Sequence, residues 1–373
     1  MVAACPYPVP QGSQVLLRAT AQALKRRGHD VYLVVYGYGD GEDDGTLPIY
    51  RCSSIPGMYR TAAGPSWGKP FADAALARTL RRVISKHAID VVHAHNYEGL
   101  MVALACRKRP IVYHAHNAMA DELPHFLSAG RILGRWLDKT FPRRADRIIA
   151  LHDRLAAYLV ECGCIAEHVA VIPPPVETEA FEFREVTAEL PPVLYAGNLD
   201  AYQNLPLLLR AMARVRSVLP QTRLLIATAD KRSIPGAEMV PVHDFKSLRN
   251  VLREDVVVVC PRVSWSGYPI KVLNAMAAAK PVVACAGASP CLINEHNGLV
   301  VPDGDDEAMA DAIRRLLNDP DLRARLGKNA RETARAHFNP DTIAKCIEDV
   351  YAAAIEITQV RNGFVHTGRH AKR

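Results

Sequence analysis

The chain has 373 residues, of which 49% are hydrophobic and 23% charged, and its formal net charge is +7. This length accommodates two medium domains with sizeable cores, and the composition excludes a disordered chain and a fibre. The small excess of basic residues favours anionic partners without indicating nucleic acid, and we expect no nucleic-acid partner.

The nine cysteines are scattered singly, and the closest pair, Cys162 and Cys164, has neither a redox nor a usual zinc spacing. They are typical of small buried side chains in a reducing compartment. No apolar run approaches the roughly 20 residues of a membrane span, and the start has no signal-peptide pattern. We therefore expect a cytoplasmic protein, whose short first strand indicates a chain that begins a few residues late.

The first elements predict a β-loop-α-β unit. A strand over 2–5 precedes a helix over 15–27 and a strand over 31–36, with Gly12 and Ser13 in the loop before the helix. Such loops face ligands, although a tight turn without a ligand is the alternative. The absence of GxGxxG argues against a nicotinamide or flavin site. Residues 37–69 are expected to form a long irregular excursion.

Four histidines stand near the ends of the next two predicted strands, over 91–94 and 111–113: His93, His95, His114 and His116. Imidazoles two residues apart on a strand share a face, so the two pairs have the means to meet, which invites a metal interpretation. No cysteine or carboxylate stands at matching spacing, and such histidines are more often hydrogen-bonded structural residues. We expect no metal.

Residues 125–155 are basic and amphipathic. One interpretation is contact with an anionic membrane surface beside a lipid-linked acceptor. The other is a helix whose apolar stripe faces the core and whose basic side is solvated. The cations are Arg131, Arg135, Lys139, Arg143, Arg144 and Arg147, and the apolar residues are Leu127, Ile132, Leu133, Trp136, Leu137 and Phe141.

Three prolines at 173–175 predict a stiff linker, after which the αβ layout repeats. A strand begins at Val193, the loop GNLDAYQN leads into a helix that ends near Val218, and a strand follows over 224–227. A later strand over 256–260 leads into the segment 264–286, SWSGYPIKVLNAMAAAKPVVACA. This repetition predicts a second open αβ domain.

The segment 264–286 is typical of a phosphate-binding loop followed by a helix. Small residues around Gly267 leave the free N–H groups of the first helical turn open to an anion. Lys271 and Asn274 lie three residues apart on one helix face. The buried stripe is predicted at Ile270, Leu273, Met276 and Ala277.

In its spacing this segment resembles the nucleotide-sugar signature of the retaining glycosyltransferases of family 4, Glu-Gly-Phe-Pro, three residues, Leu-Glu-Ala-Met-Ala, one residue, Gly-Lys-Pro-Val-Val. The runs DVVHAH, PIVYHAH and NGLVVPDGDDEAMADAIRRLLND are also similar to that family. The resemblance covers nearly the whole chain and implies an α/β fold of the GT-B type, in which two Rossmann-like domains face each other across a cleft.

The chain departs from the family pattern at its charged positions. The two signature glutamates fall on Ser266 and Asn274, and the Arg and Lys that hold the donor diphosphate fall on Asn198 and Gln203. A diphosphate leaving group needs its charge neutralised. We therefore predict that Lys271 takes over the phosphate role.

The resemblance implies roles for particular residues. His116, with His114 as the fallback, would contact the donor sugar near the reacting carbon, and His116 and Lys271 are the catalytic candidates. Ribose would lie at Asn274 and the base near His243. The full set of donor-side candidates is Gly12, Ser13, Gly197, Asn198, Gln203, His243, Ser266, Gly267, Tyr268, Pro269, Ile270 and Asn274.

The implied function is metal-independent, retaining transfer of a sugar from a nucleotide-diphosphate donor, of UDP or GDP type, to a saccharide or lipid-linked hydroxyl. It would serve polysaccharide, glycolipid or glycoconjugate synthesis, need no other cofactor, and take place in the cytoplasm or at the inner face of the membrane. Two alternatives stay open, a noncatalytic sugar-nucleotide-binding subunit and a GT-B epimerase.

The expected domains are 1–173 on the acceptor side, a linker over 174–190, and a nucleotide-sugar domain over 191–338. A helix over 339–360 is expected to cross back to the first domain, followed by a flexible tail over 361–373.

Overall fold

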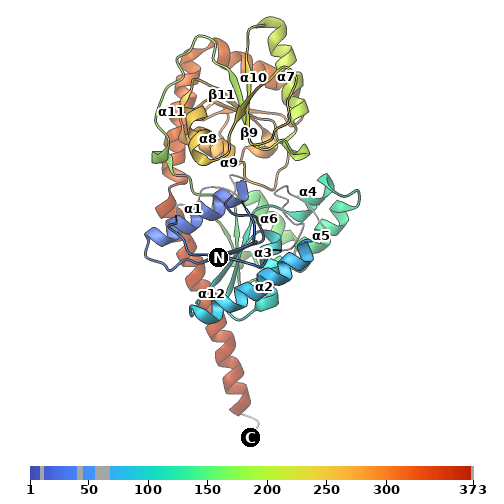
Figure 1. The fold of residues 1–373 in the computed structure, drawn as a ribbon, viewed down its shortest axis with the longest axis vertical. Helices are drawn as coiled ribbons and strands as arrows, with labels where there is room; N and C mark the ends of the chain where they lie inside the picture. The colour runs from blue at the N-terminus through green and yellow to red at the C-terminus, as the bar shows by residue number, and fades with distance from the viewer. Residues whose placement is uncertain (9–11, 40–44, 55–67, 371–373) are drawn as a thin grey trace. The chain divides into compact units, whose positions relative to one another are not determined.

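The computed structural model describes residues 1–8, 12–39, 45–54 and 68–370, and side chains as far as 361 (Figure 1). Much of the predicted irregular excursion therefore lies outside the described residues. The chain forms two compact units. The first contains residues 1–9, 20–173 and 341–373, and the second contains residues 10–19 and 174–340.

The first unit is built on a seven-stranded parallel sheet with the strand order β3-β2-β1-β4-β5-β6-β7. Its central strands are buried, as expected for a sheet covered by helices on both faces, and β4 and β5 bury histidines among their apolar residues. The strands are β1 (Val2–Ala3), β2 (Leu33–Val35), β3 (Ile49–Arg51), β4 (Val92–His95), β5 (Ile111–Ala115), β6 (Arg147–Ala150) and β7 (Val169–Val171). The helices are α1 (Gly12–Arg26), α2 (Lys69–Lys86), α3 (Asn96–Cys106), α4 (Met119–Glu122), α5 (Gly130–Thr140), α6 (Asp153–Glu161) and α12 (Pro340–His370). Only the part of α1 from residue 20 onward belongs to this unit.

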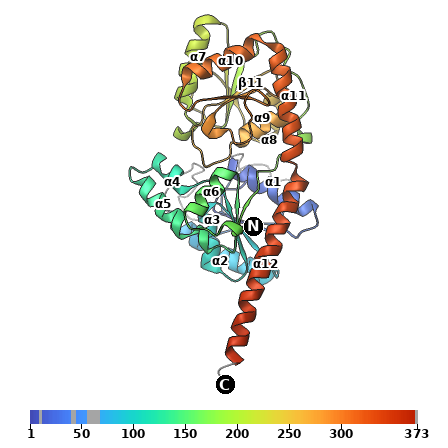
Figure 2. The same ribbon diagram turned by 180° about the vertical axis from the view of Figure 1, so that it is seen from behind.

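The last helix, α12, belongs to the first unit from residue 341 onward, and Figure 2 shows it extending past the body of that unit. Glu348 receives two hydrogen bonds from Arg27, of 2.7 and 2.8 Å, and the Tyr351 hydroxyl lies 2.6 Å from Nδ1 of His93. Where a flexible tail was predicted from residue 361, the helix continues to His370, and residues 371–373 lie outside the described part. At the start of this stretch Arg361 donates to buried Asp146 over 3.0 Å.

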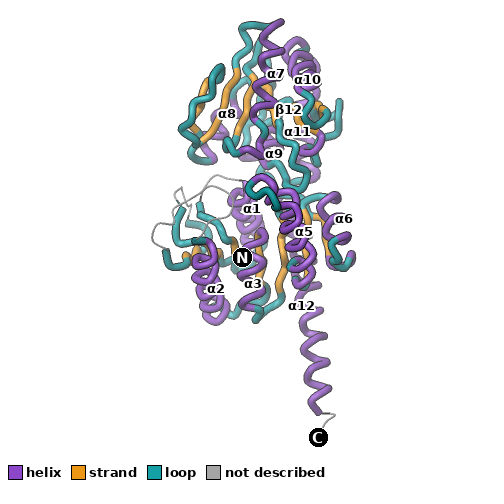
Figure 3. The backbone as a smooth tube through the Cα atoms, turned by 90° about the vertical axis from the view of Figure 1, so that its right-hand side faces the viewer, coloured by secondary structure: helices purple, strands orange, loops and turns teal. Residues whose placement is uncertain are grey.

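The second unit is built on a six-stranded parallel sheet with the order β10-β9-β8-β11-β12-β13. Figure 3 shows the strands of each unit between helices. The strands are β8 (Val193–Ala196), β9 (Leu224–Thr228), β10 (Glu238–Pro241), β11 (Val257–Cys260), β12 (Val282–Cys285) and β13 (Leu299–Val301). The helices are α7 (Leu205–Val218), α8 (Phe245–Arg253), α9 (Ile270–Ala277), α10 (Asp306–Asn318) and α11 (Pro320–His337).

Two local predictions differ from the structure. Gly12 and Ser13 form the first turn of α1 and not the loop before it. In α9 the predicted buried stripe is too narrow, because every residue from Val272 to Ala277 is buried while Ile270 is half-buried. A short helix enclosed by a sheet and by α11 has no solvated side, so its periodicity does not identify a single inner face.

Candidate functional site

The candidate site in the second unit lies where the strand order reverses. β8 and β11 are neighbours at the centre of the sheet, and from them the chain proceeds outward in opposite directions. In open α/β sheets, ligands bind outside the carboxyl ends of the strands at such a switch point. The loops that follow β8 and β11 carry most of the candidates from the sequence, from Gly197 to Gln203 and from Ser266 to Ile270.

The side chain of Lys271 lies beside the loop that follows β8. Its Nζ donates to Oε1 of Gln203 over 2.8 Å and lies 4.0 Å from the ring centroid of Tyr195. A Cβ atom on Gly197 would be only 2.8 Å from that Nζ, and Gly197 has φ +145°, which L residues rarely adopt. Burial lowers the pKa of Lys271 to about 8. The structure therefore brings Lys271, Gly197 and Gln203 together.

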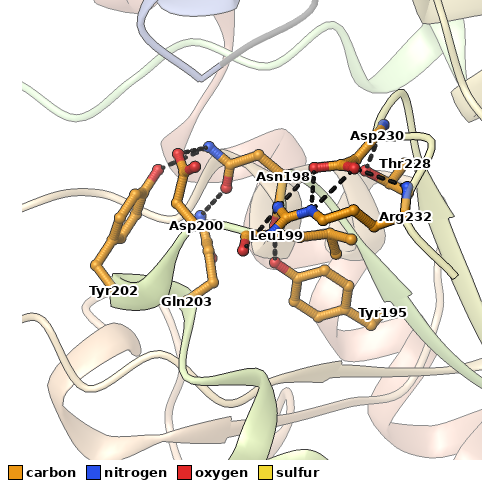
Figure 4. A network of polar contacts seen from close by, with 9 residues as sticks. All are labelled: Tyr195, Asn198, Leu199, Asp200, Tyr202, Gln203, Thr228, Asp230 and Arg232. Atoms are coloured by element: carbon orange, nitrogen blue, oxygen red, sulfur yellow. Dashed lines mark hydrogen bonds and ion pairs between the residues drawn. The ribbon is translucent and has the colours of Figure 1, made fainter. Parts of the chain in front are cut away.

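The two neutral residues at the family's cation positions hold each other in place. Gln203 donates from Nε2 to Oδ1 of Asn198 over 2.8 Å. Asn198 donates in turn to Asp200 over 2.7 Å and to the Tyr202 hydroxyl over 3.1 Å (Figure 4). The Gln203 amide thus uses its oxygen for the ammonium of Lys271 and its nitrogen for Asn198. This network keeps the Lys271 side chain beside the loop.

Arg262 also belongs to this site, and the sequence reasoning did not identify it. Its Nη2 donates to Oγ of Ser264 over 3.0 Å, and its guanidinium lies over the Tyr202 ring at 5.3 Å from the centroid. A Cβ atom on Gly267 would be 2.3 Å from Nη2. A usable signal was present, because Arg262 and Lys271 are the only basic residues between Glu254 and Ala279. Within the described residues neither forms an ion pair with a carboxylate.

The start of α9 lacks a side-chain cap, as the prediction of an anion site requires. Pro269 is the N-cap residue, and no side chain caps the helix. Ser266 and Asn274 are buried, at 0% and 6% exposure, and Tyr268 packs edge-on against Phe338. The remaining candidate of this unit, His243, is exposed, and its backbone N–H donates to Ser247 just before α8.

In the first unit the four histidines meet, at the carboxyl ends of β4 and β5. His93 Nε2 lies 3.1 Å from His114 Nδ1, and His95 Nδ1 lies 3.2 Å from His116 Nε2. Three ring nitrogens are buried without a hydrogen-bond partner among the described residues: His95 Nε2, His114 Nε2 and His116 Nδ1. Burial holds the pKa values of His93, His95 and His114 well below 6.5 and that of His116 at about 4. The four imidazoles are therefore neutral at pH 7.

Three of these histidines offer ring nitrogens within 4.8 Å of one another: His93, His95 and His114. Neutral imidazole is a zinc ligand. The ring-to-ring hydrogen bonds already engage part of this capacity, and no carboxylate joins the three rings in the described part of the chain to balance a dication. The expectation that no metal binds here stays a prediction.

Two family models match the chain. The model described as Glycosyltransferase Family 4 matches residues 10–180, and the model described as Glycosyl transferases group 1 matches residues 191–319. The chain belongs to glycosyltransferase family 4. The predicted α/β GT-B fold and the glycosyltransferase function are thereby confirmed.

Individual relatives agree with this assignment of the glycosyltransferase. A phosphatidyl-myo-inositol mannosyltransferase from Mycobacterium leprae is 27% identical, over 93% of this chain and 95% of that protein. Sucrose-phosphate synthase from Thermosynechococcus elongatus has the same fold, with a TM-score of 0.80 at 22% identity over 94% of this chain and 97% of that one. HepE from Anabaena, solved with UDP and glucose, has a TM-score of 0.73 at 18% identity over 94% of this chain and 98% of that one.

Helix α5 of the glycosyltransferase exposes its large apolar side chains and buries small and polar residues, the reverse of an ordinary amphipathic helix. Its buried residues are Gly130, Gly134 and Asp138, whereas Ile132 is 80% exposed and Trp136 is 57% exposed. The glycines allow close packing, since Cβ atoms added to them would lie within 2.5 Å of the backbone of Leu123 and Met119. The core-facing apolar stripe considered for this segment is therefore wrong for Ile132 and Trp136.

Asp138 fixes the inverted orientation of α5. Its carboxylate accepts hydrogen bonds from the backbone N–H groups of Met119 and Ala120 and from the Tyr158 hydroxyl.

No helix in the described part of the glycosyltransferase has the length and apolar character to span a bilayer.

Proposed function

We propose that this glycosyltransferase transfers a sugar from a nucleoside diphosphate donor, of UDP or GDP type, to an acceptor hydroxyl with retention and without a metal. A fold neighbour that holds UDP and glucose supports a donor of this class. Retention and metal independence rest on the resemblance to family 4. The observation that carries the proposal is the Nζ of Lys271 beside Gly197 and Gln203.

In the proposed reaction the bond between the anomeric carbon and the diphosphate oxygen breaks as the acceptor oxygen bonds to the same face. The acceptor proton passes to a phosphate oxygen. Negative charge grows on the diphosphate as its bond breaks, so a cation beside it stabilises the transition state more than the bound donor. We assign Lys271 and the backbone at Gly197 and Gly267 to the diphosphate.

The other roles follow the resemblance. Asn274 binds the ribose, as a neutral donor and acceptor in place of the family's carboxylate. His116 contacts the sugar, and its low pKa makes it a neutral hydrogen-bonding group at pH 7. Gly12 and Ser13 belong to the transfer region, and His243 to the base. Ser266, Tyr268, Pro269 and Ile270 form the wall of the donor site.

The decisive variant is Lys271→Ala. We expect kcat to fall at least tenfold, which corresponds to about 1.4 kcal/mol of transition-state stabilisation. The matched control is Lys328→Ala, because Lys328 is an exposed lysine of the same unit. An unchanged kcat in Lys271→Ala, with the control also unchanged, excludes the proposed role.

The noncatalytic subunit is the main rival, since four charged positions of the family carry neutral residues here. A thermal-shift screen with UDP, GDP, ADP and dTDP identifies the base. The protein is then incubated with labelled donors of that base and a cell extract. A labelled product or slow donor hydrolysis supports transfer, binding without turnover supports the rival, and a changed sugar on an intact nucleotide supports the epimerase.

We also propose that α5 contacts an anionic membrane surface from the cytoplasmic side, where a lipid-linked acceptor would be presented. The large apolar side chains of α5 are exposed next to its cations, an arrangement that suits a bilayer interface better than water. Flotation with liposomes, with and without anionic lipid, tests it. We expect flotation with anionic lipid only, reduced by Trp136→Glu, whereas equal floating fractions near zero remove the proposal.

A further inference from the structure

We infer that Arg262 and Lys271 together form a pyrophosphate-binding site, in which Arg262 supplies the second cation that the family carries elsewhere. The inference rests on the proposed function and names a residue that the family pattern does not assign. Both side chains belong to the second unit, so the site requires no contribution from the first.

Each cation lies against a glycine that follows one of two adjacent strands, β8 and β11. Lys271 Nζ lies against Gly197, directly after β8, and Arg262 Nη2 lies against Gly267, in the loop after β11. At either glycine a larger residue would collide with the cation. The two glycines therefore leave space for two positive charges beside the backbone groups that would meet a phosphate.

The pair is also connected through its surroundings. Arg262 lies over the Tyr202 ring, the Tyr202 hydroxyl accepts from Asn198, and Asn198 accepts from Gln203, which binds Lys271. Every link in this chain is neutral. Both ends are thus held by neutral groups, and the nearest carboxylate of this network, Asp200, accepts from Asn198 and forms no ion pair with Arg262 or Lys271 among the described residues.

The arrangement is costly without an anion. Burial lowers the pKa of Lys271, and the positive charge of Arg262 lowers this pKa further. A polyanion between the two groups would attract both cations and so offset their mutual repulsion. It would also offer several acceptor oxygens to N–H donors that have no partner in the protein.

Arg262 has those unused donors. A guanidinium carries five N–H groups in a planar fork that suits phosphate oxygens. Among the described residues, Arg262 uses only Nη2, for Ser264, and its Nε is buried without a partner. Tyr202 and Ser264 fix the plane of the group, so less side-chain freedom is lost when a phosphate binds.

The experiment measures binding by calorimetry, with inorganic pyrophosphate and with the diphosphate, monophosphate and nucleoside of the base found in the screen. The variants are Arg262→Gln, Arg262→Lys, Lys271→Gln and the control Lys328→Gln, each verified as folded by thermal unfolding. We expect Arg262→Gln to weaken pyrophosphate and nucleoside diphosphate at least tenfold while nucleoside affinity is unchanged. Arg262→Lys should recover only part of the loss, because it keeps the charge without the fork.

A second arm moves the cations back to the family positions. In the Arg262→Gln, Lys271→Gln background, adding Asn198→Arg and Gln203→Lys should restore diphosphate binding. If Arg262→Gln binds pyrophosphate and diphosphate like the wild type while Lys271→Ala still loses turnover, the inference is overturned and the proposed function stands. If the wild type binds neither pyrophosphate nor any nucleoside diphosphate, both are overturned.

Discussion

Both units carry candidate residues at the carboxyl ends of parallel strands, but these residues are neutral in the first unit and positively charged in the second. In the first, four imidazoles at the ends of β4 and β5 are buried, neutral and hydrogen-bonded to one another. In the second, Arg262 in the loop after β11 and Lys271 of α9 form no ion pair with a carboxylate among the described residues. Burial removes charge from a group with a pKa near 6.5, but a lysine or an arginine keeps it at pH 7.

This difference suits two different demands. A neutral imidazole donates and accepts hydrogen bonds, as contact with sugar hydroxyls requires. Two cations whose hydrogen-bond partners are neutral repel each other, and an anionic ligand between them relieves that repulsion. Changes of pH and of single residues therefore act on the two units in distinguishable ways.

The largest expected effect is the acid sensitivity of the first unit. Its buried histidines have folded-state pKa values below the unfolded value of about 6.5, so the unfolded chain gains protons first as pH falls. Their contribution to stability is complete above pH 6.5 and is lost below it, by about 1.4 kcal/mol per pH unit for each histidine, or up to about 5.6 kcal/mol per pH unit for four. Asp73 offsets part of this, because its pKa is raised to about 6 by burial.

Urea unfolding at pH 7.5, 6.5 and 5.5 measures this effect. A Trp265→Phe background leaves tryptophans only in the chain segments of the first unit, so fluorescence reports on that unit. His114→Gln should reduce the number of protons taken up on unfolding by about one, and His337→Gln, at an exposed position, is the control for substituting a histidine. A slope that His114→Gln does not change contradicts a neutral buried cluster.

The second effect concerns the cation pair at alkaline pH. Lys271 has a pKa of about 8 without ligand, so it is charged at pH 7 and loses its proton as pH rises through 8. Diphosphate affinity should fall about tenfold between pH 7 and 9, or about 1.4 kcal/mol. Calorimetry at fixed ionic strength measures it, and Lys271→Arg, which stays charged, should flatten the curve. The same fall in both proteins would locate the titrating group elsewhere.

The smallest expected effect tests the hydrogen bond between His95 and His116. His95→Phe removes the partner of His116 Nε2, whereas His95→Gln keeps a polar group at that position. We expect kcat to fall about fivefold in the first variant, equivalent to about 1 kcal/mol, and less in the second. Equal rates for both variants would mean that His95 does not orient His116.

Much of the fold could be predicted because it depends on short-range patterns. The apolar run of β11 and the signature spacing around Gly267 are visible in single segments, and helical phasing was enough to direct Lys271 to the loop after β8. Arg262 escaped prediction because its role depends on Tyr202 and Gly267, which approach it only in the folded unit. The orientation of α5 escaped for a related reason: hydrophobic periodicity assigns the large side chains to the core, but Gly130 and Gly134 pack closer to a neighbouring backbone than any large residue could.

The attachment of α12 to the first unit has a consequence for biosynthesis. Arg27, His93 and Asp146 emerge early from the ribosome, but their partners Glu348, Tyr351 and Arg361 are translated last. Residues 174–340 are complete before that point, so the later sheet is able to fold while the earlier one waits for its final helix. In chains truncated before residue 341, proteases should therefore cleave the amino-terminal half more readily than residues 174–340.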